Sequence, residues 1–271
     1  MGATSGQVQT VLGTTGPEAD FIILSAMRSG SGNLQDALSE HPEIDCGAEV
    51  FNPAHLQIRG RLYQEARAAR WMRLAGAGTV MAMTRHARRR FPGAMLRVAR
   101  SPRGKRMFGF RLFGDHISFF GLGPFLDDLH ARGARFVHLV RRDTFDQALS
   151  LVRAQATDVW KIASDAPAHR ARLDLPALAD RVQTAAELLH GHKLVTAAVA
   201  TRHGAMFLDY DEYTRDERSY DRIQEFLGVH TLAALRHANK KSPPVDADGY
   251  RRLREELDRR GAPMRFDLGA L

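Results

Sequence analysis

The chain of 271 residues contains one cysteine, Cys46, and no long apolar run. A single cysteine excludes an internal disulfide, and no stretch approaches the ~20 apolar residues that a membrane-spanning helix needs. Residues 1–19 are polar and rich in glycine and threonine, so they lack the apolar core of a secretory signal. These absences predict a cytoplasmic protein, with a flexible N-terminus over residues 1–19 and one domain over residues 20–271.

Acidic residues are the scarcer charged type, with 31 Asp and Glu against 39 Lys and Arg, which gives a net charge of +8. This excess favours anionic ligands. No nucleic-acid motif and no dense Lys/Arg tract with interleaved aromatic residues accompanies it, so nucleic acid is not a predicted partner. The basic segment 85–106 is typical of a solvated helix face; the alternative is a surface for an acidic acceptor or for peripheral contact with lipid headgroups.

Short apolar runs alternate with helical patterns along the chain. Strands are predicted at 21–25, 108–113, 136–140 and 205–210, and helices at 34–40, 55–100, 143–154, 178–200 and 219–238, with another ending near Arg132-Gly133. This alternation favours a single α/β domain, with a central, mostly parallel sheet flanked by helices. Ligands of such folds bind at the carboxyl ends of the strands, where Arg28, Arg142 and Asp211 are expected.

Residues 20–34 read as a strand, a tight loop and the start of a helix. Loop and first-turn N–H groups in such a unit point the same way and form an anion site. Glycines let the backbone approach a ligand, while serines and an arginine add donors. The residues that would supply these groups are Arg28, Ser29, Gly30, Ser31 and Gly32. The alternative interpretation is an ordinary Gly/Ser-rich turn between core elements.

The loop does not fit a phosphate-loop NTPase or kinase. That pattern requires a lysine and then a hydroxyl residue after its last glycine, whereas Asn33 and Leu34 follow Gly32 here. Nucleotide-dependent phosphoryl transfer also needs carboxylates that hold Mg²⁺, and no predicted strand ends in an obvious magnesium aspartate. A kinase is therefore the less favoured function.

A second candidate anion site follows the strand at 136–140. Arg142 lies at the strand-to-helix junction and Ser150 is eight residues further, so both side chains can bracket one anionic group. The alternative is an arginine paired with Asp143 or Asp146. A third candidate is Glu49, which a short strand or loop over residues 46–53 would deliver near the mouth of the site; its alternative is an exposed carboxylate paired with an arginine.

Several segments together resemble the sulfotransferases that use 3′-phosphoadenosine 5′-phosphosulfate (PAPS), in particular the bacterial branch that sulfates carbohydrates, lipopolysaccharide or Nod-factor-type glycolipids. The resemblance runs from about residue 20 to residue 260. Its segments, in chain order, are residues 21–24 with 28–31, 49–53, 108–111, 139–143 with 150–154, 157–160, 208–212 and 226–228. It implies a P-loop-like sulfotransferase fold.

The resemblance also implies roles for individual residues. The 5′-phosphosulfate would be held by the loop and first helical turn, namely Arg28, Ser29, Gly30, Ser31, Gly32, Asn33 and Leu34. The 3′-phosphate would be held by Arg142 and Ser150, and a late basic loop with Lys240 and Lys241 would close on the nucleotide. No metal is implied. The acceptor would be a hydroxyl of a small molecule or glycolipid, while the oligomeric state is not predicted.

Catalysis would use Glu49 as the base that accepts the acceptor's proton, with Arg28 stabilising the leaving phosphate. His116 is the best reserve base, followed by His55; His138 is expected in the core. The sequence departs from the family pattern at three positions: Gly32 replaces a threonine, Val50 a proline and Arg111 a lysine. The Gly32 departure keeps open an alternative, a non-catalytic nucleotide- or anion-binding module of the same fold.

Overall fold

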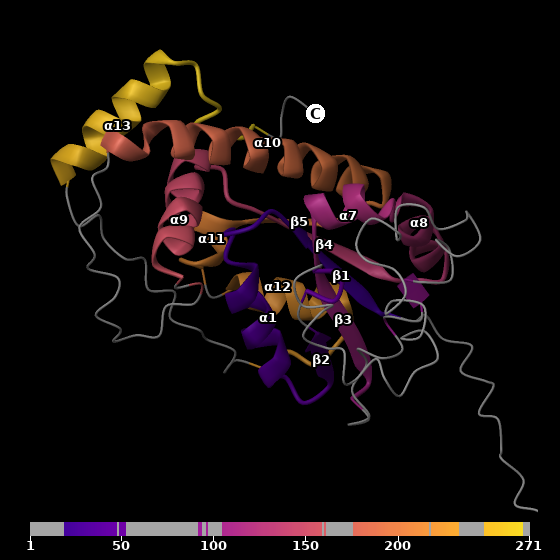
Figure 1. Ribbon diagram of the computed structural model, residues 1–271. Coiled ribbons are helices and arrows are strands. Elements are labelled where there is room, and N and C mark those ends of the chain that lie inside the picture. The colour runs from indigo at the N-terminus through magenta and orange to yellow at the C-terminus, as the bar shows by residue number, and fades with distance from the viewer. Residues whose placement is uncertain are drawn as a thin grey trace, which may run out of the picture.

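A parallel β-sheet of five strands forms the centre of the protein (Figure 1). The computed structural model describes residues 19–47, 49–52, 92–93, 96, 105–158, 160, 176–216, 218–232 and 247–267. The strands are β1 (Phe21–Ser25), β2 (Ile44–Gly47), β3 (Met107–Phe113), β4 (Arg135–Val140) and β5 (Met206–Asp209). They lie in the order β2-β3-β1-β4-β5, and every neighbouring pair is parallel, which confirms the predicted sheet.

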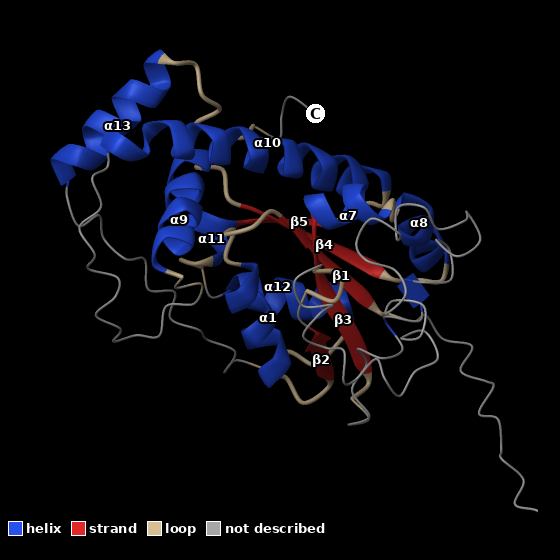
Figure 2. Cartoon of the chain, in the orientation of Figure 1, coloured by secondary structure: helices blue, strands red, loops and turns tan. Residues whose placement is uncertain are grey.

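Helices cover both faces of this sheet (Figure 2). They are α1 (Ser31–Glu40), α7 (Gly114–Phe120), α8 (Gly123–Ala131), α9 (Thr144–Thr157), α10 (Ala179–Arg202), α11 (Tyr210–Tyr213), α12 (Arg218–Leu227) and α13 (Ala247–Arg259), with a 3₁₀ turn η2 (Pro176–Leu178). Alternate side chains of β1 explain the two layers. Ile22 and Leu24 join the core beneath α7 and α8, whereas Phe21 and Ile23 join the core beneath α1 and α12. All four are fully buried, as expected for a central parallel strand.

The strand order places two loops next to each other at the centre of the sheet. β1 lies between β3 and β4, and the chain leaves β1 towards β2 but leaves β4 towards β5 on the other side. The loops after β1 and β4 therefore diverge at the carboxyl edge, which is where open parallel sheets bind ligands. This topology brings the loop with Arg28 and the turn with Arg142 to the same edge of the sheet, where folds of this class form their ligand crevice.

Three predicted helices differ from the observed ones. α1 begins at Ser31 rather than Leu34, so Ser31 itself belongs to the helix. Two helices, not one, connect β3 to β4, because Gly121 takes a left-handed φ of 60° and ends α7. The helix predicted over 219–238 ends at Leu227, before Gly228 with a φ of 71°; residues 233–238 lie outside the described part.

The predicted helical region 55–100 and most of the basic segment 85–106 also lie outside the described residues. Two basic residues at its end are described. Lys105 Nζ donates to the carbonyl oxygens of Ser39, His41 and Ile44 at 2.9–3.0 Å, so this lysine closes the turn between α1 and β2. Arg106 forms an ion pair with Glu43 at 2.7 Å. In the described ranges no helix is long and apolar enough to cross a membrane.

Candidate active site

The loop between β1 and α1 contains two residues with left-handed backbone conformation, Arg28 with a φ of 61° and Gly30 with a φ of 84°. A Cβ at Gly30 would lie 2.4 Å from the ring of Tyr210, so this position requires glycine for both space and conformation. The Gly30 carbonyl accepts from the N–H groups of Asn33 and Leu34, and no side chain caps α1. The amide groups at the start of α1 are thus suited to an anion.

Arg28 reaches from this loop to the far side of the crevice. Its Nε donates to Ser150 Oγ at 3.1 Å and its Nη1 donates to the Trp160 carbonyl at 2.5 Å. Both partners are neutral. Burial lowers the pKa of Arg28, and the neighbouring Arg141 lowers it further. A half-buried cation beside a second cation, with neutral partners, is an electrostatic arrangement that a bound anion would stabilise.

The two serines of the loop are both buried. Ser29 Oγ has no hydrogen-bond partner in the described part of the chain. A buried hydroxyl without a partner costs stability, and an oxygen or a donor of a ligand would satisfy it. Ser31 Oγ accepts from Arg111 Nη1 at 3.5 Å. Leu34 is fully buried in the core under α1, so its side chain anchors the helix rather than the ligand.

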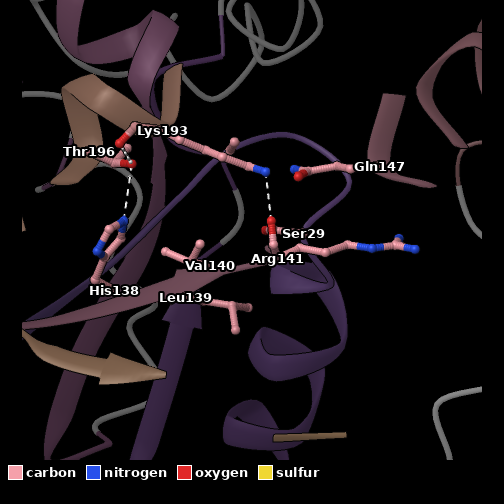
Figure 3. Close-up of a pocket in the computed structure, with 9 residues that line it drawn as sticks. Ser29, His138, Leu139, Val140, Arg141, Gln147, Lys193 and Thr196 are labelled. Atoms are coloured by element: carbon pink, nitrogen blue, oxygen red, sulfur yellow. Dashed lines mark hydrogen bonds between the residues drawn. The ribbon is translucent and has the colours of Figure 1, made fainter. Parts of the chain in front are cut away.

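A small pocket lies behind the loop, between the end of β4 and the helices α9 and α10 (Figure 3). Lys193 of α10 is 1% exposed, and its Nζ donates to the Arg141 carbonyl at 2.6 Å and to Thr144 Oγ1 at 2.8 Å. Burial, together with Arg141, lowers the pKa of Lys193 to about 7. Lys193 thereby ties α10 to the turn between β4 and α9. His138, on the same pocket wall, is 3% exposed and confirms its predicted place in the core.

Sequence reasoning missed Lys193, although a signal was present. The lysine continues the apolar stripe of α10 that includes Val182, Ala186 and Leu189, at helical spacing. A lysine inside such a stripe must find polar partners within the core.

The turn after β4 carries two arginines with different partners. Arg142 Nε pairs with Asp209 Oδ2 at 2.6 Å, and its side chain is 40% exposed. Arg141 pairs with Asp146 at 3.1 Å and lies over the Tyr210 ring at 5.0 Å. The structure therefore brings Ser150 to Arg28, and Arg142 to a strand-end carboxylate that the sequence did not indicate. The pairings considered for Arg142, with Asp143 or Asp146, are not the ones found.

Glu49 lies at the carboxyl end of the sheet beside β3. Its Oε1 is 3.2 Å from Arg111 Nη2, and its Oε2 accepts from Asn52 Nδ2 at 2.6 Å. Glu49 is thus paired with an arginine, as one interpretation of the sequence expected. Its side chain is only 16% exposed, however, so it is not an exposed loop carboxylate. Arg111 contacts both Glu49 and Ser31, and so connects the candidate base to the loop after β1.

His116 lies in α7, close behind β3, and is buried. Its Nδ1 has no hydrogen-bond partner among the described residues. Burial lowers the pKa of His116, opposed by the charges of Asp115 and Glu49. A lowered pKa favours the neutral imidazole, the form that accepts a proton, so His116 stays the reserve base. His55, Lys240 and Lys241 lie outside the described residues.

Within the described ranges, no group of three His, Cys, Asp or Glu side chains is placed to hold a metal ion.

Comparison with known proteins identifies the family. The family model described as Stf0 sulphotransferase matches residues 20–190. A search of the curated proteins gave no match. Among solved structures, the chain is similar to a sulfotransferase from Alicyclobacillus acidocaldarius, with 20% identity, a TM-score of 0.48, and coverage of 90% of this chain and 92% of the other. It is also similar to the sulfotransferase domain of the Synechococcus PCC 7002 olefin synthase, with 17% identity, a TM-score of 0.46, and coverage of 88% of each chain. The family model matches more than half of the 271 residues of this chain, so the chain belongs to the Stf0 sulphotransferase family.

Proposed function

We propose that this sulfotransferase transfers the sulfuryl group of PAPS to a hydroxyl of a carbohydrate, a glycolipid or a related small molecule. The family membership carries the reaction class, and PAPS is the donor that sulfotransferases generally use. The observation that supports donor binding at this crevice is the position of Arg28. It links the loop after β1 to Ser150 of α9, has neutral partners, and lies beside Arg141.

The donor's two anionic groups would bind in the two halves of the crevice. The 5′-phosphosulfate is assigned to Arg28, Ser29, the backbone of Gly30 and Gly32, and Ser31. The buried, unpartnered Ser29 hydroxyl supports this assignment, because an oxygen of the donor would complete it. The 3′-phosphate is assigned to the side where Arg142 and Ser150 follow β4. Gly32 stands where the family has a threonine, and its backbone N–H would donate to the 5′-phosphate in place of the missing hydroxyl.

Transfer would proceed in line. Glu49 accepts the proton of the acceptor hydroxyl while the hydroxyl oxygen forms a bond to sulfur. The bond between sulfur and the bridging phosphate oxygen breaks, which gives a sulfate ester and 3′-phosphoadenosine 5′-phosphate (PAP). Arg28 and the loop amides stabilise the negative charge that develops on the leaving phosphate. A sulfuryl group carries less charge than a phosphoryl group, so fixed cationic and N–H donors suffice for this stabilisation.

The proposal is tested by incubating the full chain with PAPS labelled in its sulfuryl group and with a panel of glycan, lipid and phenolic acceptors. Label should appear in a hydroxyl-bearing glycan or glycolipid and depend on Arg28. Arg28→Gln serves as the matched variant, because it keeps a polar side chain but removes the cation. Transfer to phenols alone would contradict the acceptor class, and binding of PAP without transfer to any acceptor would favour the non-catalytic module.

A further inference from the structure

Arg142 is held in place by a carboxylate that lies 67 residues further along the chain. Arg142 follows β4, and Asp209 is the last residue of the neighbouring strand β5. Their ion pair, Arg142 Nε to Asp209 Oδ2 at 2.6 Å, therefore spans the carboxyl ends of two adjacent parallel strands. It lies at the edge where the donor's 3′-phosphate is assigned.

Asp209 is itself fixed by the backbone. Its Oδ1 accepts from the N–H groups of Asp211 and Glu212 and so caps α11. The Asp209 side chain is 14% exposed. A carboxylate with one oxygen held by backbone amides and the other facing a guanidinium has little freedom to turn away, so Asp209 sets the position of Arg142 rather than the reverse.

Arg142 uses only one of its donor groups in this pairing. The guanidinium lies over the Phe207 ring at 5.9 Å, and the Arg142 carbonyl accepts from the Phe266 N–H at 2.9 Å. Neither Nη atom of Arg142 has a hydrogen-bond partner in the part of the chain that the structure describes, and 40% of the side chain is exposed. The Nη edge is therefore available to a ligand as a two-donor fork, the geometry that matches a phosphate.

We propose that Asp209 is a positioning residue, which orients Arg142 so that its free Nη edge binds the donor's 3′-phosphate and thereby determines the preference for a 3′-phosphorylated nucleotide. This inference rests on the proposed function. Asp209 contacts no substrate atom in this arrangement and acts through Arg142. The negative charge of Asp209 also offsets the positive charge of Arg142, so Asp209 could instead compete with the phosphate for the guanidinium. That competing role makes the opposite prediction, namely tighter PAP binding when the carboxylate is removed.

Calorimetric titration with PAP and with AMP separates these roles, because the two nucleotides differ only in the 3′-phosphate. Asp209→Asn keeps the oxygen that caps α11 and replaces the one that faces Arg142 with an amide. It should weaken PAP binding about tenfold and leave AMP binding within about twofold. Arg142→Ala should remove the preference for PAP, and Asp209→Asn added to Arg142→Ala should cause no further loss.

Two further variants keep the outcome decisive. Asp209→Ser also caps a helix N-terminus but is too short to reach Arg142, so it replaces Asp209→Asn if circular dichroism shows that the amide variant is unfolded. Glu212→Gln, in α11, removes an exposed ion pair with Arg222 of α12 and should change neither affinity.

Equal weakening of PAP and AMP by Asp209→Asn, or unchanged or tighter binding of PAP, would overturn the inference while leaving the proposed function intact. A wild-type protein that binds PAP no better than AMP would instead contradict the proposed function.

Discussion

Arg111 and Glu49 form an ion pair at 3.2 Å, and the same guanidinium reaches Ser31 Oγ at 3.5 Å. Arg111 and Glu49 are both largely buried, at 12% and 16% exposure of their side chains. Arg111 occupies the position where the family resemblance led us to expect a lysine. Its planar fork can contact two groups at once, which a lysine ammonium does with less directional control. The pair therefore fixes the candidate base relative to the loop that would hold the sulfuryl donor.

Glu49→Gln should lower kcat about 10²–10⁴-fold, because the amide cannot accept the proton of the acceptor hydroxyl. The affinity for PAP should stay within about twofold, since Glu49 is assigned no contact with the nucleotide. The rate is measured as transfer of labelled sulfuryl group to the acceptor found in the panel. Glu43→Gln is the control, because it removes a carboxylate paired with the exposed Arg106. A Glu49→Gln enzyme within about threefold of wild type would contradict the role of base.

Gly30→Ala should destabilise the protein by about 3 kcal/mol, because it combines strain at a φ of 84° with a clash against the Tyr210 ring. Gly133→Ala is the matched control. Gly133 has a φ of 95°, but no atom lies within 4 Å of its Cβ position, so only strain of about 1 kcal/mol applies. Urea unfolding measures both. An equal loss for the two variants would show that Tyr210 does not restrict the loop.

Acid should destabilise the fold through His138. Burial lowers the pKa of His138 to about 4, from an ordinary value of 6.5. Below pH 6.5 the unfolded chain binds a proton that the folded chain refuses, so stability present above pH 6.5 is lost as the pH falls towards 4. The contribution is about 2 kcal/mol between pH 7 and pH 4.5.

His138→Gln isolates this contribution, because other buried histidines act in the same direction in both proteins. The variant should lose less stability than wild type between the two pH values, whatever its stability at pH 7. The free energy of unfolding in urea is measured at both values. Parallel pH dependences for the two proteins would mean that His138 accepts its proton in the folded state as readily as in the unfolded one.

Lys105→Met should destabilise the protein by about 2 kcal/mol, because three carbonyl oxygens between α1 and β2 lose their shared donor. Arg106→Met is the control at the next position. Its ion pair with Glu43 leaves the arginine 60% exposed, so the expected loss is below about 1 kcal/mol. Denaturation midpoints measure the difference, and the affinity for PAP should not change in either variant. A Lys105→Met loss no larger than the control's would show that water replaces the ammonium.

The elements that were predicted correctly are those with a strong local signal. The runs at 21–25 and 136–140 are nearly continuous in apolar residues, and both are strands buried on two faces. His41-Pro42 marks the end of α1, which stops at Glu40. The start of α1 was placed too late because Ser31 and Gly32 have weak helix propensity, which tertiary packing of the buried face of α1 overrides.

The sequence alone determined the alternation of buried strands and helices, the Gly/Ser loop after the first strand and the family to which these segments point, because these features depend on residues near one another in the chain. Tertiary structure alone decided which charges meet. Arg28 contacts Ser150 across 122 residues, and Arg142 contacts Asp209 across 67. Such pairs follow from the strand order, which brings distant segments to the same edge of the sheet, and strand order leaves no periodic signal in the sequence. The loop around Arg28 is therefore readable from its composition, whereas its partners are readable only from the folded sheet.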